Sequence, residues 1–272
     1  MKHSSHTQYK AVFCDIDGTL LTTDHRITDR TKEKIQDIHR SGIPFILVSA
    51  RMPAGIDPIQ KELGIKAPII SYGGALILDE EGRPISSTGL SLSLAEKIRS
   101  HVPEETEDYR FCAYSGEKWI VSDRTNPVIR QEEKVTKVRA IEGQMRDFLS
   151  DSDIIHKLMC FGPSGLLDDI SAGLRAQFPQ CAIYKSFHTL LEIMDGHVSK
   201  SHAVHTLCEY LGISPQLSAA FGDNYNDADM LQAAGLGIAM GNAPEEVQKQ
   251  ASWVTADNNH EGLFLALDRL FP

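Results

Sequence analysis

Two aspartates spaced two residues apart, Asp15 and Asp17, follow the apolar run Ala11–Phe13 near the start of the chain. On an extended strand, residues i and i+2 project to the same side, so the two carboxylates would meet where the strand ends. Buried carboxylates repel each other unless a cation or a shared proton offsets their charge. The spacing therefore indicates a site at which a cation or a shared proton lies between the two carboxylates, whereas the pair Asp17 and Gly18 taken alone would indicate only a turn.

Further polar residues follow three other apolar runs that we expect to be strands. In an open parallel sheet, ligands bind outside the carboxyl ends of the strands, so side chains at these ends would converge. Asp15, Asp17 and Asp223 supply carboxylate oxygens, the hard ligands that Mg²⁺ takes together with water and phosphate oxygens. The strand-end residues are Asp15 and Asp17; Ser49 and Arg51; Asp223 with Asn224, Asn226 and Asp227; and Gly241 with Asn242.

One lysine, Lys200, lies near the start of a helix that we expect over residues 198–211. A lysine at a helix N-terminus opposes the helix dipole, and a bound phosphate would reverse that balance. Ser49 and the backbone N–H groups beside it could bind the same phosphate. Taken alone, Lys200 would be a solvated surface lysine and Ser49 a helix N-cap, so both indicate phosphate binding only together with the aspartates.

The elements that must position these residues alternate between strand and helix at both ends of the chain. Such alternation is typical of a doubly wound α/β domain with a parallel sheet. The expected strands are 11–14, 43–48, 68–71, 217–221, 237–240 and 253–255, with helices over 27–41, 60–63, 198–211, 227–234 and 261–270 and a hairpin over 75–86.

The middle of the chain has a different pattern, in which hairpins and two helices predict a separate α+β unit. We therefore expect a catalytic core made of residues 1–84 and 190–272, with an inserted domain over residues 85–189. The expected inserted elements are helices over 93–101 and 165–178 and strands over 111–114, 119–121, 154–161, 182–186 and 190–194.

Composition excludes several classes of function. The 272 residues carry 27 basic and 37 acidic side chains, a net charge of −10, which argues against a nucleic-acid-binding surface. No apolar run approaches the roughly 20 residues that span a bilayer, and no signal-peptide core precedes the first strand. We expect a cytoplasmic protein with no membrane partner. The five cysteines form no C-x-x-C pair and indicate buried free thiols.

Taken together, the polar segments after three of these strands and Lys200 resemble the four motifs of the haloacid dehalogenase superfamily. The order, the spacing and the place of the insertion resemble its Cof-type branch, whose cap domain lies between the second and third motifs. The resemblance covers nearly the whole chain. Its motifs here are Asp15-Ile16-Asp17-Gly18-Thr19-Leu20-Leu21, then Ser49-Ala50-Arg51, then Lys200 within residues 196–200, and finally Gly222-Asp223-Asn224-Tyr225-Asn226-Asp227.

The resemblance implies a Mg²⁺-dependent phosphatase that works through an aspartyl-phosphate. Asp15 would be the nucleophile and a Mg²⁺ ligand, with the Asp17 main-chain carbonyl and Asp223 completing the protein ligands. The Asp17 side chain would act first as a general acid and then as a general base, so it must begin protonated. The phosphate-binding residues would be Ile16, Ser49, Ala50, Lys200 and Asn226, supported by Thr19, Arg51 and Asp227.

The inserted cap is expected to close over this site and to contact the substrate, a small phosphorylated metabolite such as a sugar phosphate or a vitamin-type phosphate. Lys185, Ser186 and His188 are candidate contacts by position alone. Two other functions fit the same aspartates: a phosphoryl transferase or mutase that uses the same intermediate, and a phospho-accepting signalling module similar to a response-regulator receiver. The large insertion and the acid/base at Asp17 argue against the signalling module.

Overall fold

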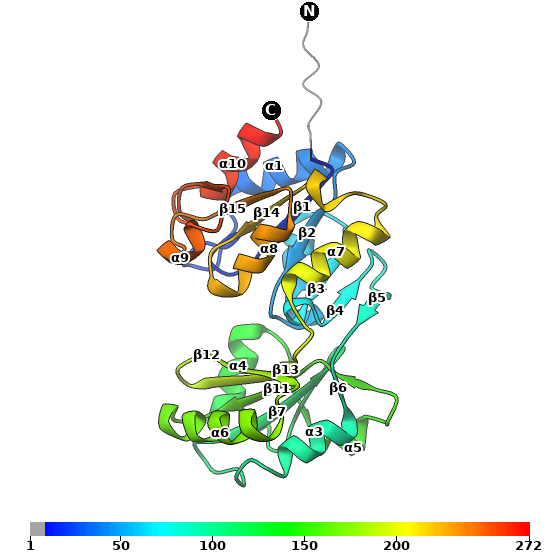
Figure 1. The fold of residues 1–272 in the computed structure, drawn as a ribbon, viewed down its shortest axis with the longest axis vertical. Coiled ribbons are helices and arrows are strands. Elements are labelled where there is room, and N and C mark those ends of the chain that lie inside the picture. The colour runs from blue at the N-terminus through cyan, green and yellow to red at the C-terminus, as the bar shows by residue number, and fades with distance from the viewer. Residues whose placement is uncertain (1–8) are drawn as a thin grey trace, which may run out of the picture. The chain divides into compact units, whose positions relative to one another are not determined.

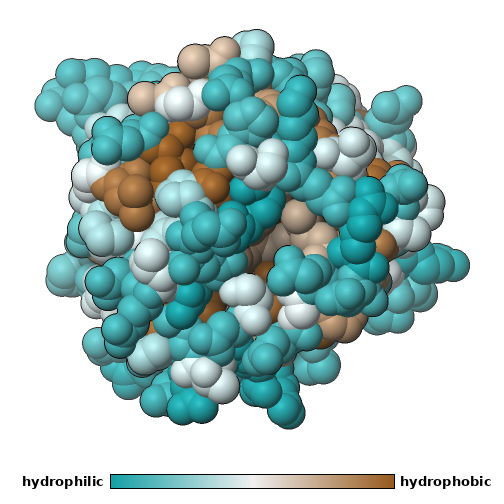
Figure 2. Space-filling model, turned by 90° about the horizontal axis from the view of Figure 1, so that it is seen from below, coloured by the Kyte–Doolittle hydropathy of each residue, from teal (hydrophilic) through white to brown (hydrophobic). Residues whose placement is uncertain are grey.

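The computed structural model describes residues 9–272 and divides into two compact units. Unit 1 contains the described residues up to Arg51 together with Ile56–Ser86 and Ser199–Pro272, and unit 2 contains Met52–Gly55 and Ser87–Val198. Among residues 9–272, no helix combines the length and the apolar character that a membrane crossing requires. The view in Figure 2 shows a surface on which hydrophilic side chains predominate, with small hydrophobic areas between them.

Unit 1 is built on an eight-stranded sheet with the order β16-β15-β14-β1-β2-β3-β4-β5. Strands β1, β2, β3, β14, β15 and β16 pair in parallel, and β4 runs antiparallel to β3. The predicted α/β fold class is therefore confirmed. The strands are β1 (Ala11–Asp15), β2 (Phe45–Val48), β3 (Ile69–Ser71), β4 (Leu76–Leu78), β5 (Pro84–Ser87), β14 (Ser218–Gly222), β15 (Leu236–Ala239) and β16 (Trp253–Val254).

Helices cover both faces of this sheet. Every residue of β1, β2 and β14 is buried, as expected for strands that contact helices on both sides. Figure 1 shows α7 and α8 on one face and α1 on the other. The helices are α1 (Asp29–Arg40), α2 (Pro53–Leu63), α7 (Lys200–Tyr210), α8 (Ala228–Ala233), α9 (Glu245–Gln248) and α10 (Gly262–Leu270), with 3-10 turns η1 (Tyr72–Gly74), η2 (Pro215–Leu217) and η3 (Tyr225–Asp227).

The local sequence explains where these helices start. Thr28 caps α1, because its side chain accepts a hydrogen bond from the Thr31 N–H, and Ile35 and Ile38 supply the buried stripe. The second helix is longer than the expected segment 60–63. It begins at Pro53, and proline suits a first helical turn because its missing N–H has no helical partner there.

Unit 2 contains a six-stranded sheet with the order β12-β13-β11-β7-β8-β9 and a short β10-β6 pair. Its strands are β6 (Leu90–Ser91), β7 (Arg110–Ser115), β8 (Lys118–Val121), β9 (Ile141–Glu142), β10 (Ile154–Ile155), β11 (Lys157–Phe161), β12 (Cys181–Phe187) and β13 (Leu190–Asp195). Its helices are α3 (Leu92–Arg99), α4 (Pro127–Thr136), α5 (Met145–Phe148) and α6 (Ser164–Gln177).

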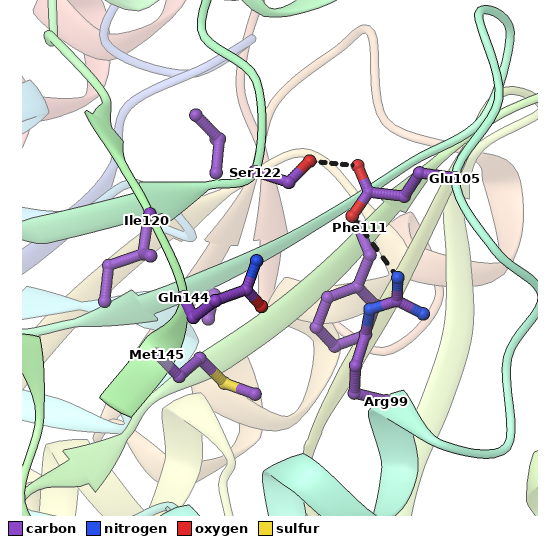
Figure 3. A pocket seen from close by; sticks show the side chains of 10 residues that line it. Arg99, Glu105, Phe111, Ile120, Ser122, Gln144 and Met145 are labelled. Carbon is purple, nitrogen blue, oxygen red and sulfur yellow. Dashed lines mark hydrogen bonds and ion pairs between the residues drawn. The ribbon is translucent and has the colours of Figure 1, made fainter. Parts of the chain in front are cut away.

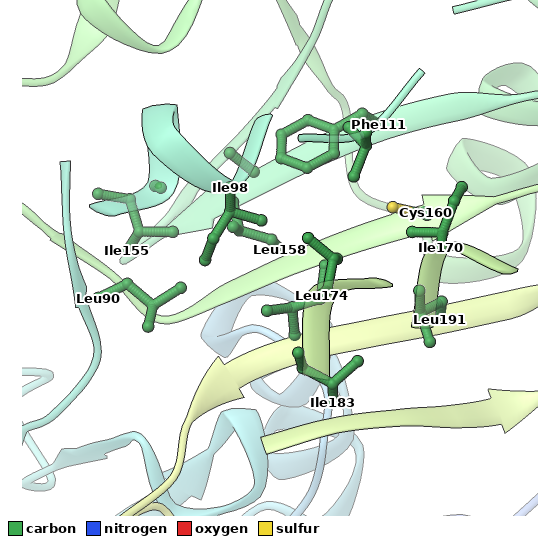
Figure 4. Close-up of a cluster of buried hydrophobic side chains, with 14 of the residues drawn as sticks. Leu90, Ile98, Phe111, Ile155, Leu158, Cys160, Ile170, Leu174, Ile183 and Leu191 are labelled. Carbon is green, nitrogen blue, oxygen red and sulfur yellow. The ribbon is translucent and has the colours of Figure 1, made fainter. Parts of the chain in front are cut away.

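The core of unit 2 joins helices α3 and α6 to one face of this sheet. Figure 4 shows Ile98 of α3 and Leu174 of α6 among side chains from β7, β11, β12 and β13. Burying these apolar groups is the main stabilising contribution to such a unit. The residues labelled in this core are Leu90, Ile98, Phe111, Ile155, Leu158, Cys160, Ile170, Leu174, Ile183 and Leu191.

Three features of unit 2 differ from the sequence-based expectation. Helix α4 was not predicted, although Asn126 caps it and Pro127 occupies its first turn. The segment 154–161 forms two strands, β10 and β11, that pair with different partners. Unit 2 also extends to Val198 instead of ending at 189, because β13 pairs with β11 and β12 and therefore belongs to this sheet.

A small polar pocket lies beside β7 and β8 (Figure 3). Its volume of about 30 Å³ leaves room for roughly one or two ordered water molecules. Glu105 lines it and accepts hydrogen bonds from the Ser122 hydroxyl at 2.6 Å and from the Arg99 guanidinium at 3.5 Å.

The three candidate substrate contacts, Lys185, Ser186 and His188, lie in unit 2. The Lys185 ammonium contacts Ser164 and Asp168 of α6, whereas Ser186 and His188 are exposed.

Candidate active site

The carboxyl ends of three neighbouring parallel strands bring the predicted site residues together. In register, Asp15 of β1 lies opposite Val48 of β2, and Cys14 lies opposite Phe221 of β14. Each strand then passes directly into a polar segment that contains Asp17, Ser49 or Asp223. Because parallel strands end at the same edge of a sheet, pairing alone places these segments side by side.

Lys200, the first residue of α7, is buried between two aspartates. Its ammonium lies 2.6 Å from Asp15 Oδ1 and 2.5 Å from Asp227 Oδ1, and the lysine is only 3% exposed. Burial alone would lower the pKa of Lys200, but the carboxylates of Asp15 and Asp227 outweigh it and raise that pKa above its ordinary value. The lysine is therefore a permanent positive charge, and the solvated surface lysine considered above is excluded.

Asp227 holds the end of β14 as well as Lys200. Its second carboxylate oxygen accepts hydrogen bonds from the backbone N–H groups of Asp223, at 3.0 Å, and Asn224, at 2.9 Å. A side chain at Gly222 would not fit, because its Cβ would lie 2.4 Å from the Cβ of Asp227. The Asp227 carboxylate thus accepts hydrogen bonds from the Lys200 ammonium and from two backbone N–H groups. It therefore holds Lys200 and the Asp223 backbone in place.

Three carboxylates gather around this single ammonium. Oxygens of Asp15, Asp223 and Asp227 lie within 4.8 Å of one another. If all three are ionised, Lys200 leaves two negative charges uncompensated. Burial, followed by the charge of Asp227, raises the pKa of Asp15, and burial raises the pKa of Asp223 to about 6. A divalent cation with a preference for oxygen ligands, such as Mg²⁺, fits both the donor set and the charge.

The loop after β1 reaches Asp223 through a glycine and a threonine. Gly18 has a φ of +86°, which favours glycine, and a Cβ there would lie 2.3 Å from Asp223 Oδ2, so a side chain at this position would displace the Asp223 carboxylate. The Thr19 hydroxyl donates to Asp223 Oδ1 at 2.8 Å. The loop is closed by the N–H of Leu21, which donates to the Ile16 carbonyl at 2.9 Å. Asp17 and Gly18 thus form a turn, as the sequence indicated, but a turn that faces Asp223.

The Asp17 side chain lies apart from the carboxylate cluster and pairs with Arg51. The guanidinium donates to both carboxylate oxygens, from Nε at 2.9 Å and from Nη2 at 2.6 Å. Asp17 is about half exposed, whereas Asp15 is buried. The two aspartates that looked like one pair therefore have different surroundings.

The remaining predicted residues lie at the same edge, with fewer contacts among themselves. The buried Ser49 accepts the N–H of Arg51 at its hydroxyl oxygen, at 3.1 Å, and thereby shapes the turn after β2. Ile16 is buried, Ala50 is half-buried, and Asn226 is exposed in η3 one residue before Asp227. The structure thus joins Asp15, Thr19, Lys200, Asp223 and Asp227 directly, and it leaves Asn226 outside this network of contacts.

Asn242 lies at the site, as expected from its place among the strand-end residues, but the sequence assigned it no role in binding or catalysis. Its amide donates to the Gly18 carbonyl at 2.9 Å and to Asp223 Oδ2 at 3.3 Å. The available signal was its place directly after β15, at the same edge of the sheet as the aspartates. An asparagine at a strand end is also common in turns, so position alone did not distinguish the two roles.

Comparison with known proteins identifies the family. The family model for haloacid dehalogenase-like hydrolases matches residues 12–267. A Haemophilus influenzae protein with the provisional name of a phosphatase is 38% identical over 267 residues, which cover 97% of this chain and 99% of that protein. The Bacillus subtilis phosphatase YwpJ is 28% identical over 278 residues, which cover 93% of this chain and 97% of that protein.

The fold has matching solved structures as well. The crystal structure of a haloacid dehalogenase-like hydrolase from Bacteroides thetaiotaomicron is 26% identical to this chain and superimposes with a TM-score of 0.86, covering 97% of this chain and 100% of that one. The match in sequence runs from β1 into α10 and includes every residue of the carboxylate cluster. The protein therefore belongs to the haloacid dehalogenase-like hydrolases, and it is an enzyme of that family.

Proposed function

We propose that the protein is a Mg²⁺-dependent phosphatase that hydrolyses small phosphorylated metabolites through an aspartyl-phosphate on Asp15. The observation that carries this proposal is the contact between Asp15 and Lys200 beside Asp223, at the carboxyl edge of a parallel sheet. A buried carboxylate next to a fixed cation is suited to attack an anionic substrate, because the lysine offsets part of the repulsion between them. The phosphatase names of the relatives support the same reaction.

The metal site would use Asp15, Asp223 and the main-chain carbonyl of Asp17. Asp227 is already held by Lys200 and by two backbone N–H groups, so we assign it to positioning Lys200. Bound at this site, Mg²⁺ would neutralise charge on the phosphate and on the attacking carboxylate.

The chemical steps then follow from Asp15 and Asp17. The Asp15 carboxylate attacks phosphorus in line, and its new O–P bond forms as the ester O–P bond breaks. The Asp17 carboxyl group gives its proton to the leaving alkoxide. It then takes a proton from the water that hydrolyses the aspartyl-phosphate, which restores Asp15. Each oxygen of Asp17 accepts one hydrogen bond from Arg51 and keeps a second lone pair, which is the position that the transferred proton would occupy.

The proposal is tested by Mg²⁺-dependent hydrolysis of p-nitrophenyl phosphate, followed by a screen of phosphorylated metabolites with phosphate release as the readout. EDTA should abolish the activity. Asp15→Asn should abolish turnover while the protein stays folded, and Asp17→Asn should slow both half-reactions. Asp57→Asn is the matched control, because Asp57 forms only an exposed ion pair with Lys61.

Normal turnover by Asp15→Asn would refute the nucleophile, and normal turnover by Asp17→Asn would refute the acid/base role. A wild-type protein that releases no phosphate from any substrate in the panel would instead point to transfer of the phosphoryl group to an acceptor other than water.

A further inference from the structure

Two asparagines from different loops clamp the loop that follows β1. Asn242, after β15, donates from Nδ2 to the Gly18 carbonyl at 2.9 Å and to Asp223 Oδ2 at 3.3 Å. Asn258, after β16, donates from its own amide to the Leu21 carbonyl at 2.8 Å. We call Asn242 and Asn258 the asparagine clamp. It contacts both ends of the segment 18–21 and one oxygen of Asp223.

The backbone determines which way the Asn242 amide points. Its Oδ1 accepts the N–H of Asn258 at 3.1 Å, and a backbone N–H can only donate. The oxygen must therefore face Asn258, which directs the NH₂ group toward Gly18 and Asp223. The two loops are joined next to this point, because the Gly241 N–H donates to the Ala256 carbonyl at 3.1 Å. Asn242 thus has one amide orientation that satisfies its neighbours.

The clamp completes the contacts of Asp223. Thr19 donates to one carboxylate oxygen, at 2.8 Å, and Asn242 donates to the other. Both donors are neutral, so they orient the carboxylate without cancelling the charge that a cation would bind. Through Gly18, the same amide also holds the loop that bears Asp17. One side chain therefore links the two parts of the proposed metal site, which lie more than two hundred residues apart in the sequence.

We propose that Asn242 is a positioning residue that holds Asp223 and the segment 18–21 in the geometry that binds the divalent cation. This inference rests on the proposed function, because the cation is the one that the phosphatase reaction would use. Asn242 does not touch the reacting atoms. Its effect should therefore fall on metal affinity, while the chemical step at saturating metal should stay close to that of the wild type.

The experiment measures Mg²⁺ binding directly. Full-length wild-type and Asn242→Ala proteins are freed of metal with EDTA, dialysed and titrated with MgCl₂ by calorimetry in the absence of substrate. Asn242→Ala should raise the Kd for Mg²⁺ about tenfold, as expected for the loss of a hydrogen bond to a charged group. At saturating Mg²⁺, its kcat for p-nitrophenyl phosphate should fall by a smaller factor than its Mg²⁺ affinity does, because Asn242 lies next to the metal site and not beside the reacting phosphate.

Asn259→Ala is the matched control. Asn259 contacts the same β1 loop, where its carbonyl oxygen accepts hydrogen bonds from the Thr23 N–H and hydroxyl, so its side chain is directed toward Thr23 and not toward Asp223. This variant should bind Mg²⁺ as the wild type does. A merely structural role for Asn242 would lower the thermal unfolding midpoint of the metal-free protein. We expect only a small change in this midpoint, because Asn242 is exposed, so a loss of Mg²⁺ affinity measured well below the midpoint would not come from unfolding.

Three results would contradict the proposal. The first is an unchanged Kd for Mg²⁺ in folded Asn242→Ala, and the second is an equal loss of affinity in Asn259→Ala. The third is a wild-type protein that binds no Mg²⁺, which would overturn the proposed function as well. A wild-type protein that binds Mg²⁺ in an Asn242-dependent manner but hydrolyses no phosphate ester would overturn the proposed function alone.

Discussion

The ammonium group of Lys200 lies 2.6 Å from a carboxylate oxygen of Asp15, and both side chains are buried. The two residues are separated by 185 positions in the chain. Their contact joins the start of α7 to the end of β1, and it places a permanent positive charge beside the proposed nucleophile. The expected consequences of this contact and of its surroundings can each be measured.

Replacing Lys200 by methionine should reduce activity strongly. The substitution keeps an unbranched buried side chain but leaves Asp15 and Asp227 without their cation. We expect kcat/KM to fall about 100-fold, a typical effect of losing one group that stabilises the transition-state charge. The free energy of unfolding at pH 7 should fall by about 3 kcal/mol, because buried carboxylates lose their partner. Lys249→Met, which affects only an exposed ion pair with Glu245, should change neither value. A folded Lys200→Met enzyme with normal kcat/KM would contradict this role.

Replacing Gly18 by alanine should damage the metal site beyond the backbone strain that it introduces. Gly42 is a close control, because its φ of +87° matches the +86° of Gly18, but, beyond its chain neighbours, no atom of residues 9–272 lies within 4 Å of a Cβ placed there. Each alanine should cost about 1 kcal/mol of stability through its positive φ. Only Gly18→Ala places a methyl group against the Asp223 carboxylate, so only this variant should lose Mg²⁺ affinity in calorimetry. Equal Mg²⁺ affinities in the two variants would show that Gly18 has no role beyond its turn.

Mg²⁺ binding should weaken sharply below pH 6. Burial raises the pKa of Asp223 to about 6 in the metal-free protein, and the cation binds the ionised carboxylate. Protons therefore compete with the metal below that pH, and the apparent Kd should rise about tenfold for each further pH unit. Calorimetry at pH 7.5, 6 and 5, in two buffers of different ionisation enthalpy, would give both the affinity and the protons released. A Kd that stays constant from pH 7.5 to 5 would be inconsistent with this site.

His156 should make unit 2 less stable in acid. The imidazole is buried between Ser87, whose hydroxyl lies 3.0 Å from Nε2, and Gly116, whose N–H donates to Nδ1 at 3.0 Å. Burial lowers the pKa of His156 from 6.5 to about 4. Between these values the unfolded chain binds the proton and the folded protein does not, so stability decreases as the pH falls through this window.

Through His156, the free energy of unfolding should be about 2 kcal/mol lower at pH 5 than at pH 7. The loss should reach about 3 kcal/mol once the pH has fallen below both pKa values. Urea unfolding of wild type and His156→Gln at pH 7 and pH 5 measures the free energy of unfolding at each pH. The difference between the two pH values should be smaller by about 2 kcal/mol in the variant. His202→Gln, at an exposed position on α7, should retain it. The same pH dependence in His156→Gln and wild type would assign the acid effect to another group.

The local sequence determined much of the fold and the centre of the site. The apolar residues 11–14 of β1 and 45–48 of β2, the Thr28 cap and the alternation of strand and helix depend on neighbouring residues, so their pattern is visible without a structure. The spacing of Asp15, Asp17 and Gly18 is equally local. It was sufficient to predict the edge of the sheet at which the carboxylates gather.

Other properties were decided only by tertiary contacts. The burial of Lys200, the pairing of Asp17 with Arg51 and the place of Asp227 in the carboxylate cluster all join segments that are far apart in the chain. The roles of Asn242 and the assignment of β13 to unit 2 are of the same kind. A sequence pattern shows which groups are present at a strand end, but the partner of each group depends on strand order and on which helix covers which face. That is why two aspartates that lie two residues apart have different partners. Asp15 contacts the buried ammonium of Lys200, whereas Asp17 forms a partly exposed ion pair with Arg51.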